Sequence, residues 1–253
     1  MRNVIAIAHK ELRSYFASPM AYIVIGFFLL PFGVFFYLYL QSFVRQGLQM
    51  SQYGGAQNIN QNVIRYVLQN ASVIILFIMP MITMRTYSEE KRSGTIELLL
   101  TSPLTDVEII LGKFFGALGL YATMLAVTLL YIGILFVYGN PEWRPIVAAY
   151  LGLLLMGGSF VSLGLLISST TNNQIVAGVI TFVVFLLLWI IGWFAESAGP
   201  TLGPITSYLS ITEHFDDFSK GIIDTKHVIF YLSLITFGLF LTAKSVDTER
   251  WRG

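Results

Sequence analysis

Cysteine is absent from this 253-residue sequence, and charged residues are scarce. Without cysteine the chain can form no disulfide, thiolate nucleophile, iron–sulfur cluster or cysteine-based zinc site. Charged residues make up only 11% of the chain, against about a quarter in soluble domains. The net charge of +1 supplies no excess of positive charge for binding nucleic acid, so no nucleic-acid partner is expected. Imidazole chemistry is confined to His9, His214 and His227.

Hydrophobic residues, by contrast, make up 55% of the chain and gather in long uncharged runs. A helix that spans a membrane requires about 20 mostly apolar residues. Six segments meet or approach that length, namely residues 20–40, 67–84, 114–138, 145–167, 175–195 and 228–243. Segments of alternating polarity about ten residues long, typical of outer-membrane barrels, do not fit these runs. We therefore predict an all-α, polytopic membrane protein in which residues 1–253 form one transmembrane domain.

The distribution of Lys and Arg predicts the orientation of these six helices. One side, residues 1–19, 85–113, 168–174 and 244–253, carries Arg2, Lys10, Arg13, Arg85, Lys91, Arg92, Lys113, Lys244, Arg250 and Arg252. The other side carries only Arg45, Arg65, Arg144, Lys220 and Lys226. Since positive charge favours the cytoplasmic side, we expect both termini in the cytoplasm of a bacterial cell, with the protein in its inner membrane. The first apolar run reads as a retained helix rather than a signal peptide.

The interior of the predicted spans is unusually free of charge. A carrier driven by protons or sodium is expected to hold a carboxylate within the membrane, and the six apolar runs contain none. Small residues recur instead, at the spacing Gly112-x-x-x-Gly116 where the third run opens, and at Gly158-x-x-x-Ser162 and Gly164-x-x-x-Ser168 along the fourth. Such spacing lets helix backbones approach closely. An energy source outside the membrane is therefore favoured over an ion gradient.

Two cytoplasmic segments flank these helices. On a helix, residues 1–19 place Ile5, Ala8, Leu12, Tyr15 and Phe16 on one face, which predicts an amphipathic helix at the membrane surface that either anchors the chain or contacts a cytosolic partner. The segment 85–113 begins with a charged extension of the second span, broken at Ser93-Gly94. A short, mostly apolar helix over 95–101 follows, and Thr105 to Glu108 form a capping-box pattern. The leucines of that short helix must be buried, either at the membrane surface or in a groove of another protein.

These motifs resemble a known family. The runs Lys10 to Tyr22, Glu89 to Pro103, Gly112-Lys113 and Glu213 to Gly221 look like the permease subunits of ABC-2-type transporters. The chain is most similar to the gliding-motility-associated permeases and more distantly similar to the nitrous-oxide-reductase maturation permeases. The resemblance implies a type V exporter-like fold with an amino-terminal connecting helix.

The resemblance also implies partners and an ATPase-coupling site. The expected partners are a separate ATP-binding-cassette ATPase carrying Mg-ATP, a second permease subunit in a homo- or heterodimer, and membrane lipids, with room for an auxiliary extracytoplasmic subunit. The expected coupling residues are Glu89, Glu90, Arg92, Gly94, Thr95, Ile96, Glu97, Leu98, Leu99, Leu100 and Pro103.

The chain has no nucleotide site of its own by sequence. A P-loop requires Gly-x-x-x-x-Gly-Lys followed by Ser or Thr. The single Gly-Lys pair, Gly112-Lys113, is followed by Phe114 and has Val107 at the upstream glycine position. A zinc-protease His-Glu-x-x-His motif is also absent. We expect no enzyme activity and no cofactor in this chain, with ATP hydrolysed by the partner.

The external segment 196–226 allows two interpretations. Glu213, His214, Asp216, Asp217 and Asp224 lie close in sequence, and such ligands suit a divalent metal ion. The favoured interpretation has no metal and is an amphipathic helix that forms a lid at the outer mouth. Its apolar face would consist of Tyr208, Ile211, Phe215 and Phe218, with the acids toward water.

Two functions remain. The first is the permease of an ATP-driven exporter, and the alternative is a structural subunit that anchors a cytosolic ATPase without transport. The sequence leaves the substrate open, because an apolar lining accepts lipids, glycolipids, peptides and drugs alike.

Overall fold

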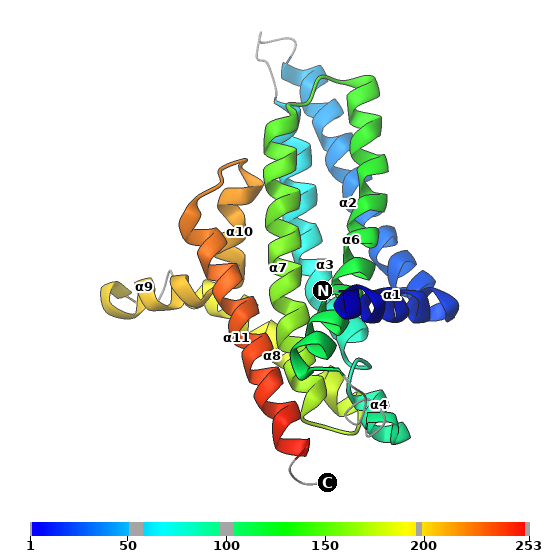
Figure 1. Cartoon of the computed structure of the whole chain (residues 1–253). Helices are drawn as coiled ribbons and strands as arrows, with labels where there is room; N and C mark the ends of the chain where they lie inside the picture. Colours follow the sequence, from blue (N-terminus) through cyan, green and yellow to red (C-terminus); the bar gives the residue numbers. More distant parts are fainter. Residues whose placement is uncertain (1, 51–57, 97–103, 196–198, 251–253) are drawn as a thin grey trace.

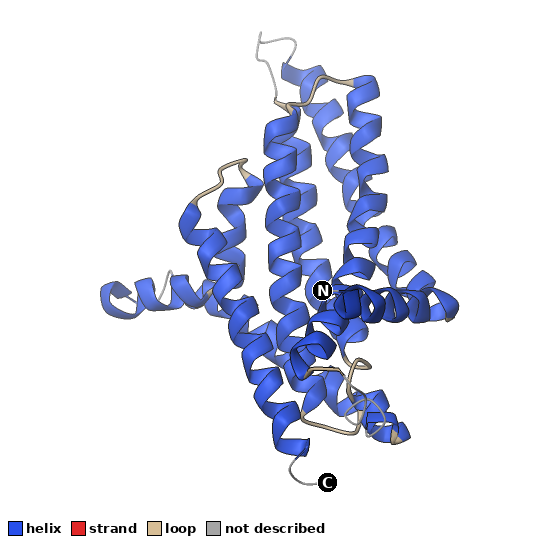
Figure 2. Ribbon diagram, viewed as in Figure 1, coloured by secondary structure: helices blue, strands red, loops and turns tan. Residues whose placement is uncertain are grey.

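The computed structural model describes residues 2–50, 58–96, 104–195 and 199–250. This part of the chain is built of helices joined by short turns, with no strand (Figure 2). The helices are α1 (Arg2–Ala17), α2 (Pro19–Met50), the π-helical turn η2 (Asn60–Ile64), α3 (Arg65–Thr83), α4 (Ser88–Ser93), α6 (Asp106–Tyr138), α7 (Trp143–Ser169), α8 (Gln174–Ala195), α9 (Gly199–Leu209), α10 (Ile211–Ser219) and α11 (Thr225–Arg250).

Six of the helical segments are long and apolar enough to cross a membrane, so the predicted all-α polytopic fold is confirmed. Each predicted run lies within or nearly within one of these segments, but the helices are longer. The first continues to Gln49 rather than residue 40, and the third begins at Asp106 rather than 114. Hydrophobicity marks only the apolar part of a helix, whereas backbone hydrogen bonding continues into the polar ends.

The enclosed centre of the bundle is made by α3 and α7. In the most apolar 18-residue stretch of each of these two segments, 67% of the residues are buried, against 22% for α2 and α11 and 17% for α8. Figure 1 shows α3 and α7 side by side with α2 and α6 on one flank and α11 on the other. The apolar side chains that remain exposed on α2, α8 and α11 suit contact with lipid or another membrane subunit.

Two helices lie across the bundle direction, α1 on one flank and α9 on the other (Figure 1). The amphipathic pattern of α1 is present but rotated from our expectation. Leu12, Tyr15 and Phe16 pack against the core, whereas Ile5 is 69% exposed. Glu11, which the apolar pattern placed outside that face, points inward to an ion pair with Lys113. The inner face of α1 is therefore partly polar.

The predicted lid is two helices rather than one. Ser210 interrupts the helix and caps α10, its side chain accepting a hydrogen bond from the backbone N–H of Glu213. Ile211, Phe215 and Phe218 are buried on α10, as the apolar face required. Tyr208 lies on α9 and is 58% exposed, so its placement on that face was wrong. A hydroxyl side chain at the N-cap competes with helix continuation, which the apolar spacing alone did not take into account.

Candidate functional site: the junction of α1, α4 and α6

Two glycines of α6 let α1 lie directly on it. A Cβ atom built on Gly112 would lie 2.5 Å from Cβ of Ile7, and one on Gly116 would lie 2.6 Å from Cβ of Glu11. Backbone carbonyl oxygens of α1 lie 3.3 Å from both of these positions. The small-residue spacing Gly112-x-x-x-Gly116 therefore serves the contact between α6 and α1, and it brings Glu11 beside Lys113.

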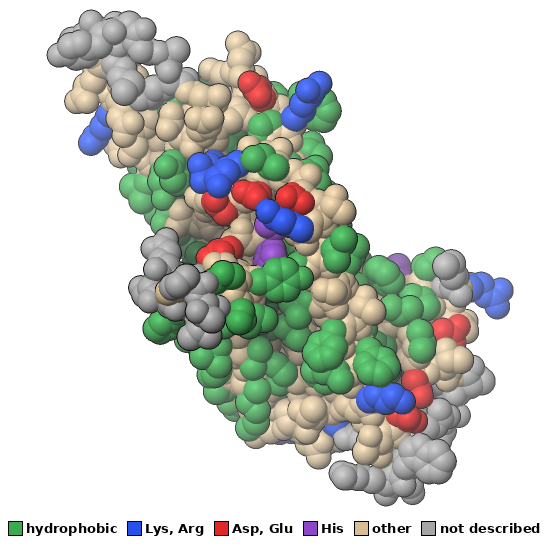
Figure 3. Space-filling model, turned by 90° about the vertical axis from the view of Figure 1, so that its left-hand side faces the viewer, with side chains coloured by type: hydrophobic (Ala, Val, Ile, Leu, Met, Phe, Trp, Pro, Cys, Tyr) green, Lys and Arg blue, Asp and Glu red, His purple; other side chains and the backbone are tan. Residues whose placement is uncertain are grey.

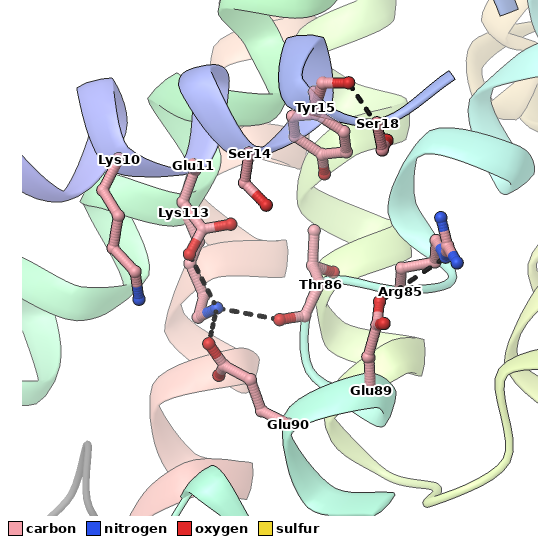
Figure 4. A pocket seen from close by; sticks show the side chains of 10 residues that line it. All are labelled: Lys10, Glu11, Ser14, Tyr15, Ser18, Arg85, Thr86, Glu89, Glu90 and Lys113. Carbon is pink, nitrogen blue, oxygen red and sulfur yellow. Dashed lines mark hydrogen bonds and ion pairs between the residues drawn. The ribbon is translucent and has the colours of Figure 1, made fainter. Parts of the chain in front are cut away.

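Lys113 is the centre of this junction. Its side chain is 1% exposed, and its ammonium donates hydrogen bonds to Glu90 Oε1 at 2.7 Å, to the Thr86 carbonyl at 2.8 Å and to Glu11 Oε1 at 3.2 Å (Figure 4). An ammonium has three N–H donors, so these three contacts satisfy it completely. We call Lys113, Glu11, Glu90 and Thr86 the junction cluster. It joins α1, the turn before α4, α4 and α6 through one buried cation.

A cavity of about 290 Å³ opens beside the junction cluster. Its lining consists of Lys10, Glu11, Ser14, Tyr15, Ser18, Arg85, Thr86, Glu89, Glu90 and Lys113 (Figure 4). Arg85 pairs with Glu89 at 3.5 Å, and burial, aided by the Glu11 carboxylate, raises the pKa of the Tyr15 phenol. The charged side chains that line the cavity pair mainly with one another. Such pairing holds helices together and does not activate a nucleophile.

The turn from α3 into α4 is held by the end of α7. The hydroxyl of Ser168 accepts hydrogen bonds from the backbone N–H groups of Tyr87 and Ser88, each at 3.1 Å, and donates to the Met84 carbonyl. Lys91 donates to the Ser169 carbonyl. The charged run therefore does not extend α3 directly but forms a separate helix after a turn. The motif Gly164-x-x-x-Ser168 supplies that contact, since Gly164 faces Thr83 of α3.

The expected coupling residues fall into three groups. Glu90 belongs to the buried junction cluster, whereas Glu89 lies at the cavity rim and Arg92 is exposed. Gly94 ends α4 in the left-handed conformation (φ 72°), where glycine is favoured, and Thr95 begins the next helical turn with Ile96. The remaining predicted residues, Glu97, Leu98, Leu99, Leu100 and Pro103, lie outside the described residues. Thr105 and Glu108 form the predicted capping box at the start of α6.

Three of the acids considered as metal ligands, Asp216, Asp217 and Asp224, are engaged in ion pairs at the opposite end of the bundle, whereas Glu213 is exposed. Asp216 contacts Arg65 at 3.1 Å and also pairs with Lys220, while Asp217 accepts a hydrogen bond from His227 at 2.8 Å. The Lys220 and Arg65 contacts lower the pKa of Asp216 against the effect of burial, and the His227 hydrogen bond lowers that of Asp217. In residues 2–50, 58–96, 104–195 and 199–250, no group of three His, Asp or Glu is placed to hold a metal ion.

A groove of about 450 Å³ lies next to these acids, between α3, α8 and α10. The rings of Trp189 and Trp193, 4.5 Å apart, form one wall, and Phe215 lines the groove with them. Polar lining comes from Gln69, Ser72, Thr212, Glu213 and Asp216. A surface that combines aromatic and polar groups suits an amphipathic molecule.

The sequence matches known proteins over most of its length. Residues 41–218 match the family described as "ABC-2 family transporter protein". The protein named "Probable multidrug ABC transporter permease YbhR" of Escherichia coli (strain K12) is 34% identical over 145 residues, and the copy in Escherichia coli O157:H7 gives the same values. The aligned region covers 56% of this chain but only 38% of each relative.

Proposed function

The chain belongs to the family of ABC-2 transporter proteins, and from this membership we propose that it is the permease subunit of an ATP-driven exporter. It is a multi-pass membrane protein whose family role is transport rather than enzyme catalysis. The ATPase that binds Mg-ATP is a separate subunit in this proposal, and two permease subunits form the pathway. Residues 1–17 and 85–105 lie on the cytoplasmic side of a bacterial inner membrane.

The observation that carries the mechanism is the junction cluster. In this proposal the segment 95–101 docks in a groove of the ATPase, as several leucine-sized side chains can each contribute about 1.5–3 kcal/mol when buried. A displacement of α4 then reaches α6 and α1 through Lys113, and it reaches α7 through the contacts of Ser168 and Lys91. The spanning helices therefore receive the motion through short hydrogen bonds rather than through flexible loops.

The substrate proposed is amphipathic. The relatives are named as multidrug permeases, and the groove beside Trp189 and Trp193 presents aromatic and polar groups together. A role in gliding motility is supported by the resemblance of the sequence motifs alone. The alternative of an ATPase anchor without transport predicts that no added substrate changes ATP hydrolysis. Stimulation of hydrolysis by an amphipathic drug in reconstituted vesicles would favour transport and count against the anchor.

Leu99→Asp should sharply reduce association with the ATPase, because a carboxylate cannot enter an apolar groove without a large loss of solvation. Glu97→Arg should affect coupling more than binding, since charges at an interface rim govern register more than affinity. Pull-down of the ATPase by the tagged permease measures association, and ATP hydrolysis measures coupling. Val107→Asp is the matched control, because Val107 is 59% exposed in the first turn of α6. Full association and transport by a Leu99→Asp, Leu100→Asp variant would rule out this docking segment.

The predicted orientation can be tested with single cysteines, because the chain has no cysteine of its own. Thiols introduced by Asn58→Cys and Ile222→Cys should react with a membrane-impermeant reagent on intact cells. The thiol of Arg92→Cys should react only after the membrane is opened. All three positions are exposed, so accessibility within the protein does not bias the comparison. Labelling at position 92 from outside would contradict the orientation.

A further inference from the structure

Two buried histidines meet between α10 and α11. Nδ1 of His214 lies 2.6 Å from Nδ1 of His227, and the residues are only 5% and 6% exposed. Nε2 of His214 lies 2.9 Å from the carbonyl oxygen of Tyr208, and Nε2 of His227 lies 2.8 Å from Oδ2 of Asp217. Figure 3 looks onto this side of the molecule and shows histidine side chains among acidic and basic ones.

The partners of the two outer nitrogens determine the proton count. A carbonyl oxygen only accepts hydrogen bonds, so Nε2 of His214 must carry a hydrogen. Asp217 also contacts the Lys220 ammonium at 3.5 Å and is a carboxylate at neutral pH, so its oxygen 2.8 Å from Nε2 of His227 accepts and that nitrogen must also donate. A neutral imidazole carries a single N–H. If both rings were neutral, each would have its hydrogen on Nε2, and the two Nδ1 atoms would face each other at 2.6 Å with a lone pair on each. One additional proton between them converts that repulsion into an N–H···N hydrogen bond.

We propose that His214, His227 and Asp217 form a buried proton-binding site that fastens α9 and α10 to α11 while it is occupied. In the occupied state His227 carries hydrogens on both nitrogens and pairs with Asp217, and it donates from Nδ1 to neutral His214. His214 in turn donates from Nε2 to the carbonyl of Tyr208 on α9. The inference does not rest on the proposed transport function.

The surroundings agree with this distribution of protons. Burial lowers the pKa of His214, which favours its neutral form, and the Asp217 carboxylate lies beside the other ring. The aromatic ring of Phe230 stacks on His214 with centroids 3.8 Å apart, and Tyr231 donates from its hydroxyl to the Ile211 carbonyl rather than to either imidazole.

The basic groups near the two histidines form ion pairs with neighbouring acids. Just after α10, Lys220 contacts Asp217 at 3.5 Å and also pairs with Asp216, which Arg65 contacts from the start of α3. Lys226 and Asp224, at the start of α11, pair with each other at 3.3 Å. Glu213 is exposed at the groove, where α8 contributes Trp189 and Trp193, while α7 meets α10 through Gly152 against Phe218. Asp217 is thus the carboxylate that contacts the pair directly.

The geometry suits a proton better than a metal ion. Zinc binds histidine nitrogen at about 2.0–2.1 Å in tetrahedral sites, which would hold two such ligands well over 3 Å apart. The two Nδ1 atoms are closer than that, and the described part of the chain brings no third ligand to them.

The proton can be located directly by nitrogen-15 NMR of histidine-labelled protein in lipid bilayers. The variant His9→Gln leaves two histidines, so each ring gives its own pair of signals. At pH 7 we expect one ring protonated on both nitrogens and one neutral ring protonated on Nε2. Two neutral rings would overturn the proposal. Signals that change on treatment with a metal chelator would overturn it as well, in favour of a metal site.

The consequence for helix packing has a separate test. The thiol of Ser219→Cys lies on α10 at a position that is 4% exposed, so its labelling reports loosening of α10. Its rate is divided by that of Ile222→Cys, which is 53% exposed, to remove the effect of pH on thiol reactivity. The contact between the rings needs the extra proton, so the stabilisation is fully present at pH 6, below the ordinary histidine pKa of about 6.5, and is lost as pH rises and the folded pair releases that proton.

We expect the corrected labelling rate to rise about tenfold between pH 6 and pH 9, equivalent to about 1.4 kcal/mol of opening free energy. His227→Gln cannot hold the proton, so its rate should be high at both pH values. His9→Gln should keep the original response, because His9 lies on α1. A corrected rate that is the same at both pH values, or the same with and without His227→Gln, would overturn the role in packing.

Discussion

Lys113→Met is expected to destabilise the protein by about 3–5 kcal/mol and to release α1 from the bundle. The substitution keeps much of the side-chain volume but removes the ammonium that pairs with Glu11 and Glu90. Two carboxylates would then face each other without a cation in a largely enclosed site. Breaking a buried ion pair on one side costs far more than the intact pair contributes, because the remaining charge stays desolvated.

The measurement is the denaturation midpoint of the purified protein in one detergent, together with thiol labelling of Ser14→Cys on α1, which lines the junction cavity. Lys10→Met is the matched control, because Lys10 lines the same cavity but is exposed. It should shift the midpoint little, as exposed charges contribute at most about 1 kcal/mol. If Lys113→Met and Lys10→Met behaved alike, the junction cluster would not be the element that holds α1.

The parts of the fold that depend on local sequence were predictable. Apolar runs indicated the six spans, and the small-residue spacing in α6 and α7 indicated close helix contacts. The capping box at Thr105 and the helix end at Gly94 depend on residues within one turn, so the sequence contains the whole signal. The spanning helices are longer than the apolar runs, because polar residues at the ends of a span continue the helix without raising its hydrophobicity.

The candidate site depends on contacts between residues far apart in sequence. Lys113 follows Glu11 by 102 positions and Glu90 by 23, and Ser168 meets Ser88 across 80 positions. No local pattern pairs such residues. One signal was available: Lys113 is a charge next to an apolar run, and such a charge requires a partner. Tyr208 was misplaced for a related reason, since its spacing from Ile211 was correct but Ser210 between them ends one helix and caps the next.

The histidine pair could not be predicted from the sequence, because local patterns do not pair residues on different helices. His214 and His227 are 13 positions apart and lie on different helices, so sequence alone suggested only His214, as a metal ligand among acids. In the structure Asp216 pairs with Arg65 and Lys220, and Asp217 with His227. The turn between α10 and α11 brings His214 and His227 together, and Gly221 in this turn adopts a positive φ of 86°.

Gly157→Ala is expected to destabilise the bundle, whereas the same change at the next residue is not. A Cβ on Gly157 would lie 2.1 Å from Cε1 of Tyr121, a fully buried ring of α6 whose hydroxyl donates to the Leu153 carbonyl at 2.7 Å. That hydrogen bond fixes the ring, so it cannot move aside. Overpacking of this kind costs about 1–3 kcal/mol.

Gly158→Ala is the matched comparison. The nearest atom to its Cβ would be the end of the Ile235 side chain, at 3.1 Å, which can shift by a few tenths of an ångström, and Phe114 at 3.8 Å is in ordinary contact. Both substitutions gain about 1 kcal/mol from the better helix propensity of alanine, so that contribution cancels between them. The difference between their denaturation midpoints in one detergent therefore isolates the contact with Tyr121. Equal midpoints would mean that the ring yields, and the close approach of α6 to α7 would then not depend on glycine at position 157.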